Sequence, residues 1–260
     1  MSTFASYTLE LKSPLHLGSR RAGVVSQTHR HAPGHLFVYA LAAAVGMNRG
    51  STPDVFAKAL EEITGRFRFG PAFFMRLDKR MEDAEVERDM VTSNHHVTLE
   101  GDTRSAVESA LFEVECLNPA PHLGVRLAGG VWYKGGDTID KRPLRDWLGI
   151  LRLGGEQKMG LGRVSCDGWK NNSSQYPGLS GKVIPEGLSV SAGEQLMGAA
   201  LDGVHTAPLV PWLGRRHDAN LGFGRQLSQA VLVRMNGHVE TDACFLPSVG
   251  DPGVGCWQRV

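Results

Sequence analysis

The stretch Leu151–Val164 reads LRLGGEQKMGLGRV and contains four glycines, Gly154, Gly155, Gly160 and Gly162. Glycine allows positive φ and lets a second backbone segment approach closely, so this spacing predicts a loop shaped to hold something. The stretch follows an apolar run, and Val164 opens a second, strand-like run. The loop therefore joins two elements of the core.

Three positive charges, Arg152, Lys158 and Arg163, lie on or beside this loop, with Met159 near its tip. Exposed backbone N–H groups and cations together suit a phosphate backbone. The loop lacks the Gly-Lys-Ser/Thr of a nucleotide P-loop and the G-x-G-x-x-G spacing of a dinucleotide site. A tight glycine-rich hairpin that binds nothing remains the alternative.

A second copy of the pattern occurs near the C-terminus. Gly160-Leu-Gly-Arg-Val-Ser is matched by Gly222, Phe223, Gly224 and Arg225 in GFGRQLS. Both copies read glycine, apolar residue, glycine, arginine, and both run toward a strand-like stretch. They predict two loops that line one shared groove.

Composition indicates a globular protein with locally concentrated charge. The chain has 260 residues, 42% hydrophobic and 21% charged, and a net charge of +1. Residues 1–50 and 121–170 each carry a net charge of +4, whereas residues 51–120 carry −6. A nearly neutral protein of this kind can still present a cationic groove.

The cysteines and the apolar runs of the sequence indicate the cellular compartment in which the protein is expected. Four cysteines occur without a C-x-x-C pair, which disfavours a disulfide framework or a zinc knuckle and favours free thiols in a reducing compartment. The sequence after Met1 is polar, and no apolar run reaches the roughly 18 residues of a membrane span. We expect a cytoplasmic protein with no membrane contact.

Hydrophobic patterning predicts short strands with a few interspersed helices. Strands are expected at 7–12, 67–77 (interrupted by Gly70-Pro71), 110–117, 125–133 and 229–235, and helices at 35–45, 53–64 and 143–151. Residues 19–34 read as a basic loop, the Gly129-Gly130 pair as a β-bulge, and 170–180 as a flexible insertion. The absence of regular β-α alternation predicts an α+β fold with antiparallel sheet.

Histidines are the candidate residues for a metal site or for catalysis. His29, His31 and His35 are close in sequence, but their spacing is not that of a common metal motif, so we expect neither metal nor other cofactor. His16 or His29, in or beside a basic loop, could act as general base toward a ribose 2′-hydroxyl. A metal-independent endoribonuclease therefore stays open.

Three patches together resemble a known family. The segment LKSPLHLGSRRAGVVSQTHRHAPGHLFVYALAAAVG, residues 11–46, resembles the first strand, loop and helix of the RAMP superfamily of CRISPR-associated proteins, and LGGEQKMGLGRV resembles its glycine-rich loop. LGFGRQLS is similar to the C-terminal glycine motif of the Cas-five group, which caps the 5′ end of the guide RNA in type III effector complexes.

The resemblance implies tandem ferredoxin-like (RRM-like) domains with a degenerate second half. We expect residues 1–165 to form the first domain and 166–260 a smaller β-rich domain that completes the RNA groove. It further implies a non-catalytic subunit that binds the repeat-derived 5′ tag of CRISPR RNA, beside backbone RAMP subunits and a large or nuclease effector subunit. A related group of the superfamily cuts precursor RNA with a loop histidine.

The residues predicted to contact RNA are those of the basic loop and of the two glycine motifs. They are His16, Gly18, Arg20, Arg21, Thr28, His29, Arg30, Gly34, Arg152, Gly154, Gly155, Lys158, Met159, Gly160, Gly162, Arg163, Gly222, Phe223, Gly224 and Arg225. The arginines and lysine would neutralise phosphates. His16, Met159 and Phe223 would stack on bases, whereas Trp212 is expected in the core.

Overall fold

The computed structural model describes residues 2–99, 102, 106–212, 215–218, 222–227, 231–250 and 253–260, and only the backbone of residues 98–99, 106–110, 215–218 and 222–227. Helices and largely antiparallel sheets are intermixed along the chain, so the predicted α+β class is confirmed. Within the described residues, no helix is both long and apolar enough to cross a membrane.

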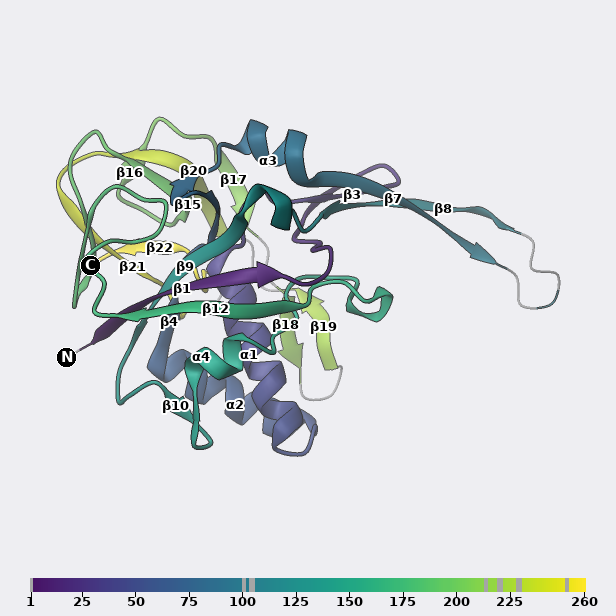
Figure 1. The fold of residues 1–260 in the computed structure, drawn as a ribbon, viewed down its shortest axis with the longest axis horizontal. Coiled ribbons are helices and arrows are strands. Elements are labelled where there is room, and N and C mark those ends of the chain that lie inside the picture. The colour runs from purple at the N-terminus through teal and green to yellow at the C-terminus, as the bar shows by residue number, and fades with distance from the viewer. Residues whose placement is uncertain are drawn as a thin grey trace.

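The central sheet has the strand order β12-β1-β9-β5-β6 (Figure 1). These strands are β1 (Thr3–Leu11), β5 (Phe73–Arg76), β6 (Lys79–Arg80), β9 (Val125–Tyr133) and β12 (Val164–Asn171), and β4 (Phe67–Phe69) also pairs with β9. All pairings within this sheet are antiparallel. The predicted strands at 7–12, 67–77 and 125–133 are therefore confirmed, as is the break at Gly70-Pro71.

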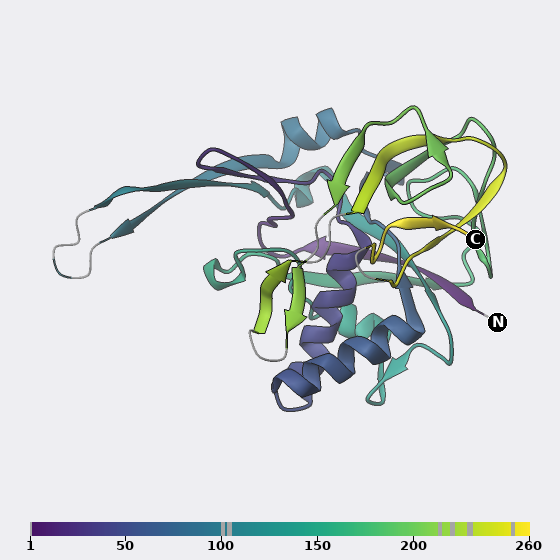
Figure 2. The same cartoon turned by 180° about the vertical axis from the view of Figure 1, so that it is seen from behind.

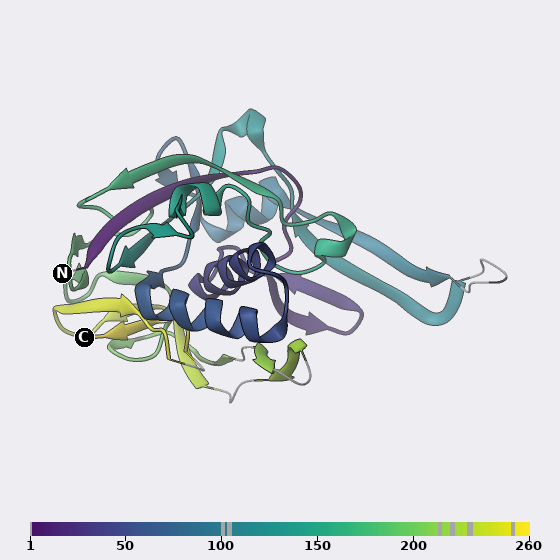
Figure 3. The ribbon, with the colours of Figure 1, turned by 90° about the horizontal axis from the view of Figure 1, so that it is seen from below.

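Helices cover one face of this sheet (Figure 3). They are α1 (Gly34–Asn48), α2 (Pro53–Arg66) and the short α4 (Leu144–Leu148), close to their predicted positions. Strand β1 alternates as a half-covered strand does: Ala5, Tyr7 and Leu9 are fully buried in the same core as the helices, whereas Phe4 belongs to the core on the other face.

The Gly129-Gly130 pair makes room for aromatic rings and forms no bulge in the ladder with β1, so that prediction is wrong. The ladder between β1 and β9 runs through both glycines without a register shift. A Cβ on Gly129 would lie 2.7 Å from the hydroxyl of Tyr7, and one on Gly130 would lie 2.5 Å from the ring of Phe4. The glycines are needed because rings from β1 occupy both faces above them.

A second sheet packs on the open face of the first. Its order is β13-β14-β21-β22-β15-β20-β16, with β17 also on β20. The bounds are β13 (Lys182–Ile184), β14 (Gly187–Val190), β15 (Gln195–Ala200), β16 (Val204–His205), β17 (Leu209–Trp212), β20 (Val231–Val239), β21 (Ala243–Pro247) and β22 (Trp257–Arg259).

Tyr176 joins the two sheets. Its ring lies 5.8 Å from that of Trp132 on β9 and 5.5 Å from that of Trp257 on β22, and its hydroxyl donates a 2.6 Å hydrogen bond to the carbonyl of Pro71. The prediction of a flexible insertion at 170–180 is therefore wrong. The segment reads as polar because Tyr176 is its main buried side chain.

A long hairpin projects from this body as an arm (Figures 1 and 2). It consists of β7 (Val91–Leu99) and β8 (Ala106–Leu117) and follows α3 (Asp83–Met90). At its base, the predicted basic loop instead forms a second hairpin, β2 (Gly18–Ala22) and β3 (Val25–Thr28), with β3 parallel to β8. Short elements complete the fold: β10 (Thr138–Ile139), β11 (Arg142–Pro143) and the 3₁₀ turn Pro121–Leu123.

Candidate nucleic-acid interface

The glycine-rich loop is fastened to the segment that follows β1. The N–H of Gly155 donates to the carbonyl of His16 at 2.9 Å, and the N–H of Gly162 donates to the carbonyl of Pro14 at 2.8 Å. The N–H of Arg163 donates to the Ser13 hydroxyl at 2.9 Å. Residues far apart in sequence, predicted separately to contact RNA, therefore lie together.

Two of the four glycines are required by the protein's own backbone. Gly154 has a φ of +77°, and a Cβ there would lie 2.1 Å from the His16 carbonyl oxygen. Gly162 has a φ of +87°, and a Cβ there would lie 2.3 Å from the carbonyl oxygen of Leu153. The close backbone approach predicted for this loop thus exists, but it is an internal one. Gly160, with a φ of +87° and open space around it, only turns the loop.

The loop is exposed and carries one cation, Lys158, at its tip and two, Arg152 and Arg163, where its ends pair with each other. Residues Gln157–Met159 form a 3₁₀ turn, preceded by Glu156 at a φ of +53°. Arg152, Lys158 and Arg163 are exposed, and no acid within the described residues pairs with them. Their charge is available to an anion.

Strand β2 adds exposed cations at the base of the arm. Arg20 donates to the side-chain amide oxygen of Gln27, and Arg21 donates to the carbonyl of Gly23 at 3.2 Å. Both acceptors are uncharged, so the positive charge of neither guanidinium is compensated by them. The two arginines belong to a strand that is exposed along its whole length.

His16 lies between the loop and the arm. It is 7% exposed, and its Nδ1 is 2.7 Å from the carbonyl oxygen of Glu115 on β8. Since a carbonyl only accepts, Nδ1 is the donor of this hydrogen bond and carries a proton. A Cβ on Gly18 would lie 3.4 Å from Nε2, and one on Gly155 would lie 3.2 Å from Cδ2. Two glycines thus lie against the Nε2–Cδ2 edge of a ring that is itself buried.

Thr28 and Arg30 are used internally. The Thr28 hydroxyl accepts the N–H of Leu17 at 2.8 Å. Arg30 forms ion pairs with Glu87 and Glu115 and donates to the carbonyl of Thr28 at 2.6 Å. Two acids already compensate this guanidinium, so Arg30 has less charge to offer than Arg20 and Arg21 have.

Gly34 serves packing. A Cβ there would lie 2.1 Å from the carbonyl oxygen of Phe69, so β4 requires glycine at the start of α1.

The three histidines His29, His31 and His35 form a cluster in which His31 is buried and the other two are partly buried. His29 and His35 pack against Trp212, which is buried as expected, with ring centroids 6.0 Å and 5.5 Å away. The ring of His31 lies 5.8 Å from that of His29 and 5.7 Å from that of Phe73. Burial, followed by nearby positive charge, lowers the pKa of His29 to about 3 and that of His31 to about 4, and burial with the His29 ring lowers the pKa of His35 to about 4. A group this weakly basic is a poor general base near pH 7.

The second glycine motif is part of a strand, so its description as a loop is wrong. Gly222–Leu227 form β19, which pairs with β18 (Arg215–Asp218). The side chains of Phe223 and Arg225 lie outside the described residues. Figures 1 and 2 show this hairpin and the 152–163 loop on the side of the body from which the arm projects.

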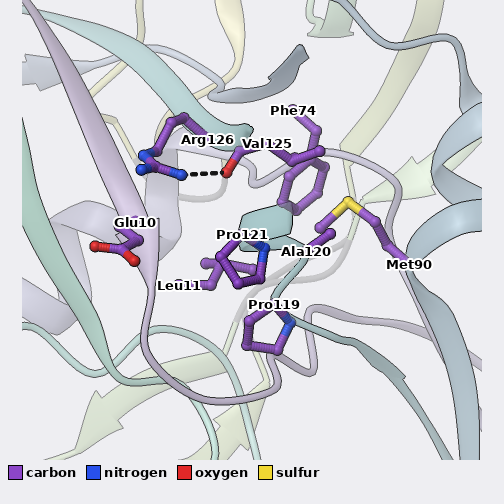
Figure 4. Close-up of a pocket in the computed structure, with 9 residues that line it drawn as sticks. All are labelled: Glu10, Leu11, Phe74, Met90, Pro119, Ala120, Pro121, Val125 and Arg126. Atoms are coloured by element: carbon purple, nitrogen blue, oxygen red, sulfur yellow. Dashed lines mark hydrogen bonds between the residues drawn. The ribbon is translucent and has the colours of Figure 1, made fainter. Parts of the chain in front are cut away.

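A small enclosed cavity below the arm does not serve as a ligand site. It has a volume of about 10 Å³, room for about one water molecule, and is lined by residues of β1, β5, β9, α3 and the segment before β9 (Figure 4). On its rim Arg126 donates to the carbonyl of Val125 at 3.0 Å.

Comparisons with known proteins agree with the sequence resemblance. Residues 78–178 match the family model described as CRISPR-associated protein (Cas_Cmr3). A chain of the type III-B Cmr-beta complex bound to cognate target RNA and AMPPnP has the same fold, with a TM-score of 0.55, 9% identity, and coverage of 98% of this chain and 99% of that one. A Cmr-beta chain bound to cognate target RNA matches at a TM-score of 0.42 and 13% identity, over 65% of this chain and 60% of that one. No curated protein matches the sequence.

Residues 78–178 therefore resemble a CRISPR-associated family, and the whole chain shares its fold with a chain of a type III-B complex. The arm, the turn before β9 and the glycine-rich loop all fall within the segment that resembles Cmr3.

Proposed function

We propose that this chain is a non-catalytic subunit of a type III CRISPR ribonucleoprotein and that it holds the repeat-derived 5′ tag of the guide RNA. The proposal depends above all on the glycine-rich loop, which the chain ties to His16 while leaving its cations exposed. Arg20 and Arg21 extend the same basic surface along β2. Such an arrangement neutralises phosphates, and the Nε2 edge of the His16 imidazole lies beside it.

The strand order supports the finer fold assignment within this proposal. Taking β1, β5, β9 and β12 as the four strands of a β-α-β-β-α-β unit, their order in the sheet is fourth, first, third, second. Helices α1 and α4 then occupy the two helix positions, on one face of the sheet. A ferredoxin-like unit has this strand order, and we propose that the first domain is such a unit. Because its fourth strand, β12, ends at Asn171, we place the end of the first domain there and not at residue 165, and the second domain after it.

Neighbouring subunits follow from the same role. A chain that caps the tag would contact backbone RAMP subunits and a large or nuclease effector subunit in the cytoplasm, and the ribonucleoprotein would serve antiviral defence. The low pKa of His29 disfavours it as the base of a precursor endoribonuclease.

Binding of labelled tag RNA to the full chain tests the proposal. Arg152→Glu combined with Arg163→Glu should weaken binding at least about tenfold, because two phosphate-neutralising charges are reversed. Lys58→Glu combined with Lys134→Glu, two exposed lysines elsewhere, is the matched control. Equal affinity of the two double variants would overturn the proposal. Incubation with precursor RNA in EDTA should leave the RNA intact, and a discrete cut lost in His16→Ala would replace this function with the endoribonuclease.

A further inference from the structure

A groove of about 1030 Å³ crosses the part of the central sheet that neither the helices nor the second sheet covers. Its floor is formed by Ser6 and Thr8 of β1 and Ala128 of β9. One wall is the segment 173–181, and the other contains the turn between β5 and β6. None of the described lining residues belongs to the 152–163 loop or to β2, so this is a separate surface.

The charge of the groove is positive. Four cations, Lys79, Arg80, Arg126 and Lys170, line it beside one acid, Asp78. Arg126 is paired with Asp167 at 2.6 Å and Arg80 with Glu82 at 3.2 Å. Lys79 and Lys170 are exposed and have no acidic partner among the described residues. Two free ammonium groups above a floor with two hydroxyls are complementary to an anion.

The floor does not suit stacked bases. Ser6 lies between Lys170 on β12 and Gly130 on β9, and Thr8 lies opposite Ala128, so the central positions carry small side chains. Among the described lining residues Tyr176 alone is aromatic, and it is 2% exposed. A nucleic acid here would be held through its phosphates and sugar hydroxyls.

A peptide strand fits less well than a nucleic acid. Peptides that bind to sheets usually add at an edge, where backbone N–H and C=O groups are unpaired. Strand β1, which forms much of the floor, is paired on both sides, with β9 and with β12. Recognition must therefore come from the side chains of the walls and floor, and those are cationic and hydroxylic.

We propose that this groove is a second RNA-binding surface, which grips the sugar–phosphate backbone of one strand without reading its bases. Thr8 and His16 are eight residues apart in the chain, so the groove and the glycine-rich loop are separated by at most about 29 Å. One RNA strand can span both surfaces. The groove contributes to RNA affinity whether or not the glycine-rich loop recognises the tag.

Salt-dependent binding of an oligouridine of about 20 nucleotides to the full chain tests this inference. In Lys79→Gln with Lys170→Gln, affinity at low salt should fall about tenfold, and the slope of log K against log[salt] should become about 1.4 smaller, at about 0.7 per lost phosphate contact. Lys58→Gln with Lys134→Gln should change neither. A mixed-sequence RNA should behave as oligouridine does.

Two results would overturn the inference. One is an unchanged slope in the Lys79/Lys170 variant. The other is a variant that keeps its RNA affinity but loses binding of polyglutamate, which would make the groove a docking site for an acidic protein segment. The Arg152/Arg163 variant is measured in parallel. If it weakens RNA binding while the Lys79/Lys170 variant does not, the loop binds RNA and the groove does not; the opposite pair of results supports the groove and overturns the proposed role of the loop.

Discussion

The backbone N–H of Gly155 donates a 2.9 Å hydrogen bond to the carbonyl oxygen of His16, so the glycine-rich loop is tied to the chain just after the first strand. This bond connects two segments more than a hundred residues apart in sequence. Close contact of the two segments requires glycine at position 154, whereas Gly160 only turns the tip of the loop.

Gly154→Ala should destabilise the protein more than Gly160→Ala. Both positions have positive φ, which costs an alanine about 1 kcal/mol, but only the Cβ at position 154 meets a backbone atom, the His16 carbonyl oxygen at 2.1 Å. We expect a loss of about 2–4 kcal/mol in unfolding free energy for Gly154→Ala and about 1 kcal/mol for Gly160→Ala, measured by urea denaturation. Equal losses would show that the loop base is not held as described.

Tyr176 should be a main stabilising contact between the two sheets. Tyr176→Ala removes a buried ring that contacts Trp132 and Trp257 and should cost about 3–5 kcal/mol. Tyr176→Phe keeps the ring but leaves the Pro71 carbonyl without its hydrogen bond and should cost about 1–2 kcal/mol. Thermal and urea denaturation measure both changes. A Tyr176→Ala variant as stable as wild type would contradict the packing.

Stability should fall as the pH is lowered from about 6.5 toward 4. His29, His31 and His35 have pKa values of about 3, 4 and 4 in the folded protein, below the ordinary 6.5, so the unfolded chain binds more protons in this range. The stabilisation is complete above pH 6.5 and is lost as pH falls. Each buried histidine contributes at most about 1.4 kcal/mol per pH unit.

Urea denaturation at pH 7.5, 6 and 5 measures this dependence, and His31→Gln should reduce it. His122→Gln, at an exposed position, should leave it unchanged. A midpoint that does not move with pH would refute the buried, neutral state of the cluster.

His16→Asn should separate the structural role of this side chain from its role toward RNA. The asparagine amide can donate to the Glu115 carbonyl in place of Nδ1, so the melting temperature should change little. The variant lacks the ring nitrogen near Gly18, and affinity for the tag should fall about three- to tenfold. Full affinity in His16→Asn would assign the ring a packing role alone.

Local patterning was enough to predict the elements that bury one regular face. Strands β1 and β9 and helices α1 and α2 were found because alternation or helical spacing marks a single core-facing side. Strand β2 was missed because it is exposed throughout and shows no alternation, and its hairpin is held by distant pairing of β3 with β8. Tyr176 was missed because its partners come from other elements.

The candidate interface was partly predictable. The spacing of Gly154 and Gly162 indicated close backbone approach, but the sequence could not show that the approaching atoms belong to the protein itself. Likewise, Arg30 looked like Arg20 and Arg21 in the sequence, and only the fold brings Glu87 and Glu115 to it. The groove beside Lys79 and Lys170 had no sequence signal, because its residues come from five separate segments.

Photocrosslinking maps the contact surface most directly. Tag RNA carrying 4-thiouridine, irradiated with the full chain and analysed by mass spectrometry of the peptides, should give crosslinks within residues 152–163 and 16–22, and Arg152→Glu with Arg163→Glu should abolish those in the loop. Crosslinks confined to other surfaces, with neither of these segments labelled, would contradict the proposed RNA interface.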